Sequence, residues 1–195
     1  MNIELLMALI TFCFVSSITP GPNNLMLLSS GLNFGLRYSL NHLFGVTFGF
    51  GIMVLLVGIG IGKLFELLPM SYEILKWLSV IYLTYLAYKI ANNHISDQGS
   101  CSAQPFTFKQ ACLFQWVNPK AWTMAISGNA IYASDQTLSA VLTVTAIFIL
   151  VNFPSICCWL VMGRQMKRFI ESPMRVKLFN WLMAGLLIYS IIPML

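Results

Sequence analysis

Long apolar segments alternate with short polar ones along the whole chain. Six of them can be marked, at about residues 4–32, 40–62, 72–92, 108–131, 138–163 and 177–194. Each is close to the roughly 20 residues that an α-helix needs to cross the hydrocarbon layer of a bilayer. The pattern predicts an all-α membrane protein with six transmembrane helices, built as one integral membrane domain over residues 1–195.

Composition agrees with this pattern. The chain has 195 residues, of which 58% are hydrophobic and 9% are charged, and its mean hydropathy is +0.79. A soluble domain carries about 25% charged residues. A chain with so few charges is therefore not an ordinary soluble protein. The formal net charge of +5 is concentrated in loops, which indicates membrane topology and not a nucleic-acid partner.

The distribution of lysine and arginine predicts the orientation. If the N-terminus is outside, the two outer loops hold Lys63 and Lys76. The cytoplasmic side then holds Arg37, Lys89, Lys109, Arg164, Lys167, Arg168, Arg175 and Lys177. Because cytoplasmic loops carry the excess of basic residues, we expect both termini on the periplasmic side.

Two proline-containing runs interrupt apolar segments. Thr19-Pro20-Gly21-Pro22-Asn23 lies inside the first segment, and Asn118-Pro119-Lys120 lies inside the fourth. Proline removes a backbone donor and clashes with the preceding turn, so both segments are predicted to be broken helices. At membrane depth a broken helix is tolerated only where it is buried in protein or lines a cavity. Transporters build substrate sites in this way.

The two breaks occupy matching positions. Cys13 lies seven residues before Pro20, and Cys112 lies seven residues before Pro119. Three spans in each half, about residues 1–95 and 105–195, would give the halves opposite orientations. The prediction is therefore two inverted three-helix repeats, with the substrate site where the broken helices meet. The polar stretch from Asn92 to Gln104 is interpreted as the linker between them.

Polar residues within the spans are candidates for this site. Lys120 lies eleven residues beyond Lys109, about 16 Å at helical rise, and a lysine at such depth is a functional hypothesis by default. The alternative is that Lys120 binds carbonyls freed at a proline break. Asn23, Asn118 and Asn152 join the candidates. For Asn24 and Asn152, a bond to a neighbouring helix is the favoured alternative.

Glycine is concentrated in the second segment. Gly45 and Gly49 form a G-x-x-x-G pattern, as do Gly31 and Gly35. Small residues at this spacing allow close approach of membrane helices. We interpret both pairs as packing within the chain, and a homo-oligomer contact is the alternative.

Together these motifs resemble the LysE/RhtB family of amino-acid exporters. The resemblance rests on Thr19–Asn23, the glycine-rich second segment and the run Phe114–Trp122, and it extends over essentially the whole chain. The Pro-Gly-Pro-Asn-Asn run and the compact length are most similar to the cysteine/O-acetylserine exporter subgroup. The resemblance implies export of neutral or thiol-type amino acids across the bacterial inner membrane. From the two breaks and the polar residues within the spans, the predicted substrate-binding residues are Thr19, Pro20, Gly21, Pro22, Asn23, Asn118, Pro119, Lys120 and Asn152.

The family also implies coupling to the proton gradient. None of the six acidic residues is predicted deep in a span, and proton relays in membranes usually use buried carboxylates or histidines. Three alternatives are therefore left open: Lys120 carries the proton, the substrate's own ionisable groups carry it, or the coupling is different. The expected partners are an amino-acid substrate, lipid and protons, without nucleic acid.

No catalytic constellation is recognisable in the sequence. There is no nucleophile–base pair, phosphate-binding loop or metal set, so we expect no enzyme activity, no cofactor and no metal. Two other function classes stay open, a thiol–disulfide electron carrier and a non-transporting membrane scaffold, in which Lys120→Ala would affect only stability. Cys13 and Cys112 would suit a transmembrane thiol–disulfide electron carrier, although buried cysteine is usually a small apolar filler.

Overall fold

The computed structural model describes residues 1–61, 67, 70–92, 105–170 and 172–192. Most of the predicted linker, residues 93–104, lies outside the described residues, as do residue 62 and residues 193–194 at the ends of two predicted segments. The described part is helical throughout. Its helices are α1 (Ile3–Ile18), α2 (Pro22–Tyr38), α3 (Leu40–Gly58), α5 (Met70–Ala91), α6 (Phe108–Phe114), the 3₁₀ turn η2 (Gln115–Val117), α7 (Pro119–Tyr132), α8 (Leu138–Met166) and α9 (Pro173–Tyr189).

The helices confirm an all-α membrane protein. Three of them are long and apolar enough to cross a bilayer, namely α3, residues Glu73–Ala91 of α5, and α8. The pair α1 and α2 passes the same test as one broken span, bent by 55°. The described residues therefore support three or four spans by length and composition, and the count of six stays a prediction.

The first break has the form that its prolines dictate. Helix α1 ends at Ile18, and Thr19, which precedes Pro20, is extended at φ −65° and ψ 147°. Gly21, which precedes Pro22, is extended at φ −176° and ψ 174°, and Pro22 is the first residue of α2. A residue before proline is pushed out of the helical region, whereas proline is favoured at the first helical position. The predicted break is confirmed.

The second break repeats this logic in the fourth segment. Helix α6 begins at a capping box in which Thr107 and Gln110 satisfy each other's backbone N–H groups. It tightens into η2 and stops at Asn118, which is extended at φ −94° and ψ 107° before Pro119 starts α7. The predicted break at Asn118-Pro119 is confirmed as well.

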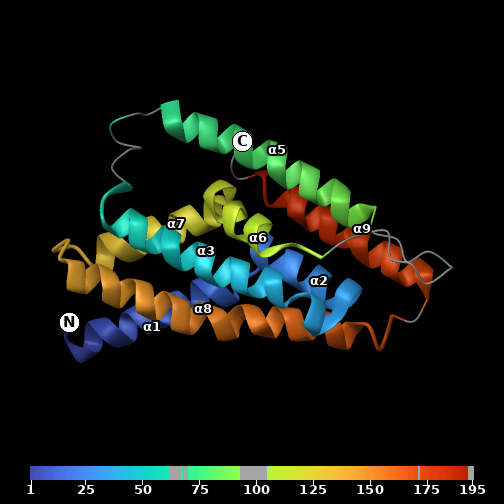
Figure 1. Cartoon of the computed structure of the whole chain (residues 1–195), viewed down its shortest axis with the longest axis horizontal. Coiled ribbons are helices and arrows are strands. Elements are labelled where there is room, and N and C mark those ends of the chain that lie inside the picture. The colour runs from blue at the N-terminus through green and yellow to red at the C-terminus, as the bar shows by residue number, and fades with distance from the viewer. Residues whose placement is uncertain (62–66, 68–69, 93–104, 171, 193–195) are drawn as a thin grey trace.

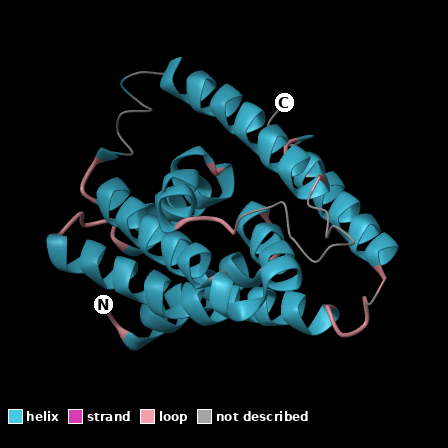
Figure 2. Ribbon diagram, turned by 45° about the vertical axis from the view of Figure 1, so that its right-hand side comes forward, coloured by secondary structure: helices cyan, strands magenta, loops and turns pink. Residues whose placement is uncertain are grey.

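Helices far apart in the sequence lie side by side. Helix α3 packs along α8, and α5 packs along α9 at one side of the molecule (Figures 1 and 2). Helices α1 and α2 pack on α8, whereas α6 and α7 pack on α3. Each broken segment thus lies against a long helix from the other part of the sequence, α8 or α3.

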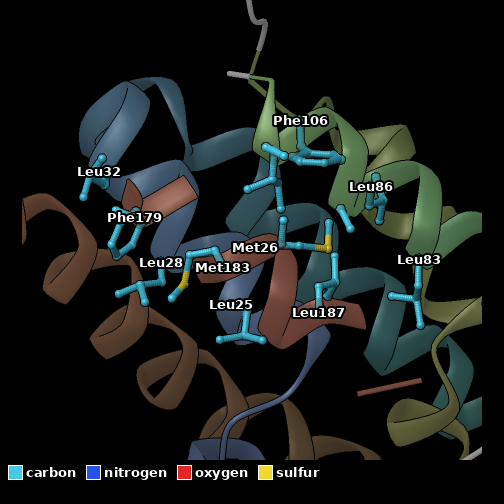
Figure 3. Close-up of a cluster of buried hydrophobic side chains, with 14 of the residues drawn as sticks. Leu25, Met26, Leu28, Leu32, Leu83, Leu86, Phe106, Phe179, Met183 and Leu187 are labelled. Atoms are coloured by element: carbon cyan, nitrogen blue, oxygen red, sulfur yellow. The ribbon is translucent and has the colours of Figure 1, made fainter. Parts of the chain in front are cut away.

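An apolar core joins the α5–α9 pair to the rest of the bundle. Met26 of α2 lies fully buried beside Leu83 and Leu86 of α5 and Leu187 of α9 (Figure 3). Phe179 of α9 lies near Leu28 and Leu32 of α2 in the same cluster (Figure 3). Helix α2 is therefore packed against α8 on one side and α9 on the other.

Small residues set the closest helix crossings. A Cβ on Gly31 would collide with the carbonyl oxygen of Leu160, and one on Gly163 with that of Leu28, so α2 and α8 touch backbone to backbone. A Cβ on Gly45 would lie 2.6 Å from the Phe108 oxygen on α6. The packing interpretation is confirmed for Gly31, Gly45 and Gly49, and Gly35 is different: it kinks α2 at φ +76°.

The outer surface is apolar. Large hydrophobic side chains point outward from the long helices, including Ile81 of α5 (65% exposed), Leu150 of α8 (68%) and Leu178 of α9 (71%). Soluble proteins rarely expose apolar surface on this scale. Such a surface fits a multi-pass protein whose solvent is lipid.

Candidate functional site

The two helix breaks meet through Lys120, the second residue of α7. Its Nζ donates to the Thr19 carbonyl oxygen at 2.7 Å, to Thr19 Oγ1 at 2.9 Å and to the Pro20 carbonyl oxygen at 3.3 Å. An ammonium has three donors, and all three are used. The interpretation that Lys120 binds carbonyls freed by a proline break is therefore confirmed.

The other carbonyls at the end of α1 are also bound by side chains. Pro20 has no N–H for the Ser16 carbonyl, and Thr19 Oγ1 donates to that oxygen instead at 3.0 Å. Asn24 Nδ2 donates to the carbonyls of Ser17 and Thr19, both at 2.8 Å. The last turn of a helix normally leaves such oxygens without a helical partner. Here the broken end is completed by its own chain.

Helix α8 contributes to the same end. Trp159 Nε1 donates to the Ile18 carbonyl at 3.0 Å. The carboxyl end of α1 is consequently held by side chains from α2, α7 and α8. Any movement of these elements relative to α1 must break hydrogen bonds at this point.

A second contact between the two breaks is a pair of side-chain amides. Asn23 of α2 and Gln115 of η2 exchange reciprocal amide bonds, with Nδ2 to Oε1 at 2.8 Å and Nε2 to Oδ1 at 3.0 Å. Gln115 Nε2 also donates to the Ala111 carbonyl at 2.9 Å. Gln115 is fully buried. This pairing fixes the start of α2 against the tightened end of α6.

A small polar cavity lies between the breaks. Its volume is about 20 Å³, which is room for about one water molecule. In this closed arrangement it is too small for an amino acid. The wall is formed by Ser16, Ser17, Gly21, Asn23, Asn24, Phe50, Asn118, Lys120, Ala121, Met124, Asn152 and Ile156.

Two buried oxygens in the wall have no hydrogen-bond partner among the described residues. They are Ser17 Oγ and Asn152 Oδ1, and the two residues are 4% and 5% exposed. An unpaired buried polar group costs about 1–3 kcal/mol. A buried polar group without a protein partner therefore calls for a partner from outside the chain, such as a water molecule, an ion or a ligand.

The cavity wall has groups that would attract an anion and groups that would accept hydrogen bonds from a cation. The N-termini of α2 and α7 both contribute residues to its wall, and α2 has no side-chain cap. Helix N-termini attract anions, and Lys120 adds a full positive charge. The carboxyl end of α1, with Ser17 Oγ and Asn152 Oδ1, offers acceptors for a cationic donor. No acidic residue occurs among the described residues that form the wall.

The structure brings the predicted site residues together. Gly21, Asn23, Asn118, Lys120 and Asn152 line the cavity. Thr19 and Pro20 bind Lys120, while Pro22 and Pro119 begin the two half-helices. What these residues bind stays a prediction.

A bond to a neighbouring helix was the favoured alternative for Asn24 and Asn152, and the outcome differs between them. Asn24 does satisfy a neighbouring helix, because its amide binds two carbonyls at the end of α1. For Asn152, Oδ1 has no hydrogen-bond partner among the described residues. This atom therefore does not make the expected bond to a neighbouring helix.

Sequence reasoning missed three contributors. They are the Ser17 hydroxyl, the Gln115 amide and the Trp159 indole. Gln115 lies within the run Phe114–Trp122 but was not singled out, and the other two belong to no motif. Only the distance of Ser17 from Pro20, three residues along the chain, was a usable signal. Helical spacing cannot orient Trp159, because α8 is apolar on all sides.

The cysteines are not part of this site. Cys13 is buried in an apolar cluster with Leu9, Phe50 and Val144, and neither Cys13 nor Cys112 is among the residues of the cavity wall. Cys112 packs against Gly49. In the described residues Cys13, Cys112, Cys157 and Cys158 are free thiols. Nothing in this arrangement favours the electron-carrier alternative.

A second buried polar group lies outside the cavity wall. His42 Nδ1 and Ser30 Oγ are 2.9 Å apart, and Asn33 Nδ2 donates to Asn180 Oδ1 at 3.0 Å. His42 is fully buried and its ring lies 4.8 Å from that of Phe106. These bonds connect α2 to α3 and α9 at the end opposite the break.

A helical membrane protein with two interrupted helices around a polar cavity has the construction of a small-solute translocator. Comparison with known proteins agrees. The model of the LysE type translocator family matches residues 14–191, so the chain belongs to this family. No solved structure matches it significantly.

Curated relatives are similar over nearly the whole chain. The cysteine/O-acetylserine efflux protein of Escherichia coli O139:H28 is 32% identical, covering 97% of this chain and 96% of the relative. The protein of the same name from Escherichia coli K12 is 31% identical over the same shares. That of Shigella flexneri is 31% identical, with 95% and 94% covered.

Proposed function

We propose that this protein is a secondary active exporter of amino acids of the neutral or thiol type. It would move them from the cytoplasm to the periplasm across a bacterial inner membrane, driven by the proton gradient. Family membership and the cysteine/O-acetylserine efflux relatives support an amino-acid exporter. The observation that carries the proposal is the meeting of two broken helices at a polar cavity with unpaired buried oxygens.

The cavity suits a zwitterion. An amino acid carries a carboxylate and an ammonium, and the wall has a region for each. The N-termini of α2 and α7, with Lys120, would receive the carboxylate. The carboxyl end of α1, with Ser17 and Asn152, would receive the ammonium. Thr19, Pro20, Gly21, Pro22, Asn23, Asn118 and Pro119 shape this site as backbone or amide groups.

Transport requires the closed cavity to open alternately to the two sides. A cavity of about 20 Å³ must expand before an amino acid enters. We infer that one half rocks against the other, residues 1–95 against 105–195, as inverted repeats do. The side-by-side packing of α3 with α8 and of α5 with α9 supports such a relation. The contacts of Lys120 with Thr19 and of Asn23 with Gln115 would break and re-form in each cycle.

The basic residues support an orientation with both termini in the periplasm. Arg37 and Lys89 lie in the last turns of α2 and α5, and Arg164 lies in that of α8. Arg175 and Lys177 lie near the start of α9. These helix ends point toward the same side of the molecule (right in Figure 1). This end would face the cytoplasm.

The experiment is efflux of labelled amino acids from cells that express the chain. We expect cysteine or O-acetylserine to leave faster than from cells with an empty vector. Asn152→Leu should reduce export strongly, because a buried acceptor in the cavity wall is lost. The control is Asn92→Leu, matched for membrane abundance, whose exposed amide lies just beyond the end of α5. The proposal is wrong if no amino acid leaves faster with the intact chain.

Proton coupling is tested in proteoliposomes. An imposed pH gradient should drive the amino acid against its concentration gradient, and a protonophore should abolish this accumulation. Accumulation that survives the protonophore would point to another driving force.

A further inference from the structure

Every backbone carbonyl at the carboxyl end of α1, from Ser16 to Pro20, accepts a hydrogen bond from a side chain. The carbonyls of Ser16, Ser17 and Ile18 are bound by Thr19, Asn24 and Trp159. The remaining oxygens, those of Thr19 and Pro20, are bound by Lys120. A substrate ammonium can take the place of one of these donors only if that donor moves away.

Lys120 is the donor best suited to move. The amides of Asn24 and the indole of Trp159 sit on short, rigid side chains, whereas the lysine ammonium ends a flexible four-carbon stem. Its stem crosses Gly21, where an added Cβ would lie 2.7 Å from Lys120 Cδ. Its partners are two carbonyls and one hydroxyl, without a carboxylate. A cation held by neutral oxygens is exchangeable, because no ion pair has to be separated.

We propose that the Lys120 ammonium is a tethered occupant of the subsite that binds the substrate's ammonium. The Thr19 carbonyl, Thr19 Oγ1 and the Pro20 carbonyl would hold Lys120 when the carrier crosses without cargo, and the substrate ammonium when it crosses loaded. This inference rests on the proposed function. On loading, Lys120 Nζ turns from these oxygens to the substrate carboxylate, so three hydrogen bonds to an ammonium are kept in both states.

The unpaired oxygens in the wall fit the same exchange. Ser17 Oγ and Asn152 Oδ1 line the same cavity as Lys120 and have no partner among the described residues. Acceptors of this kind need N–H or O–H donors. The subsite therefore selects primary ammonium compounds, and a trimethylated ammonium, which has no N–H, should not be carried.

On this proposal, Lys120 matters most in the step in which the carrier returns without substrate. Without Lys120, the Thr19 and Pro20 oxygens would lose their hydrogen bonds to an ammonium, at a cost of about 1–3 kcal/mol or a factor of about 5–150 in rate. A carrier loaded with substrate has the substrate ammonium in this place. Net efflux needs the unloaded return, whereas exchange of substrate for substrate does not.

The test compares these two modes in proteoliposomes with labelled cysteine under reducing conditions. Lys120→Met should lower net efflux into cysteine-free buffer by about 10-fold or more and leave exchange at saturating cysteine within about 3-fold. The control is Lys109→Met, an exposed lysine on α6, which should change neither. Unchanged net efflux overturns the inference, and so does equal loss of both modes that no added ammonium rescues.

A chemical rescue separates this role from a structural one. Propylammonium added to Lys120→Ala should restore net efflux, because a free ammonium can refill the subsite, and trimethylpropylammonium should not. If Lys120→Met loses both modes, absence of rescue in Lys120→Ala overturns the inference. Failure of the intact chain to move cysteine in either mode would instead count against the proposed function.

Discussion

At the scale of single residues, the site follows from what proline takes away. Pro20 and Pro22 remove backbone donors, and the oxygens left over are bound by Thr19, Asn24 and Lys120. Buried carbonyls must find partners. Most polar side chains near the first break therefore stabilise the broken helix, and the Ser17 hydroxyl is an exception.

Asn24→Leu should destabilise the protein. The change leaves the Ser17 carbonyl without its 2.8 Å donor and removes one of two donors from the Thr19 carbonyl. We expect a loss of about 1–3 kcal/mol, measured as a lower melting temperature in detergent. Asn92→Leu, at an exposed amide, is the control. Equal melting temperatures for both variants would contradict the hydrogen-bond assignment.

Ser17→Ala, in contrast to Asn24→Leu, should impair export without lowering stability. Its hydroxyl is buried and unpaired, so replacement with an apolar group should leave the melting temperature unchanged or raise it. If the hydroxyl serves substrate, the KM for export should rise by about 3- to 30-fold, corresponding to one hydrogen bond of about 1–2 kcal/mol. A fall in stability with an unchanged KM would show that the hydroxyl is structural.

At the scale of elements, the α2–α8 crossing fixes the position of the first break. The two helices meet at Gly31 and Gly163, where each glycine faces a carbonyl of the other helix. On α8, Trp159 is next to this contact in sequence, and Asn152 lies about two helical turns before it. The close crossing therefore helps to place both polar side chains.

Gly31→Ala should separate α2 from α8. A methyl group cannot fit against the Leu160 carbonyl without backbone movement, and overpacking typically costs about 1–3 kcal/mol. We expect a lower melting temperature together with reduced export. Gly185→Ala on α9 is the matched control, since nothing lies within 4 Å of its added Cβ. Should both variants melt alike, the close crossing is not required.

At the scale of the whole molecule, topology is the property that decides the direction of transport. The basic helix ends gather on one side, and α1 begins on the other (Figure 1). The prediction is that Met1 and the end of α9 face the periplasm.

Single cysteines test this topology in a background without native cysteines. Asn2→Cys and Ile192→Cys should react with a membrane-impermeant thiol reagent added to intact spheroplasts. Tyr38→Cys and Phe169→Cys, at residues 69% and 77% exposed, should react only after the membrane is opened. The reverse labelling would invert the orientation and with it the proposed direction of export.

The sequence by itself determined the class of the molecule and the location of its breaks. Few charges and long apolar segments allow only a membrane protein, because a bilayer imposes both length and hydrophobicity. Pro20, Pro22 and Pro119 ended or began helices where expected, because proline's geometry is local and does not depend on the fold. The approximate limits of the helices followed for the same reason.

Only the tertiary structure decided which residues meet. Lys120 binds Thr19, which is 101 residues away in the sequence. Gln115 binds Asn23, which is 92 residues away. Membrane helices are apolar on all sides, so their periodicity does not show which face looks inward. The partners of Lys120 and the unpaired oxygens of Ser17 and Asn152 depend on close packing between helices far apart in sequence, and local preferences do not encode that contact.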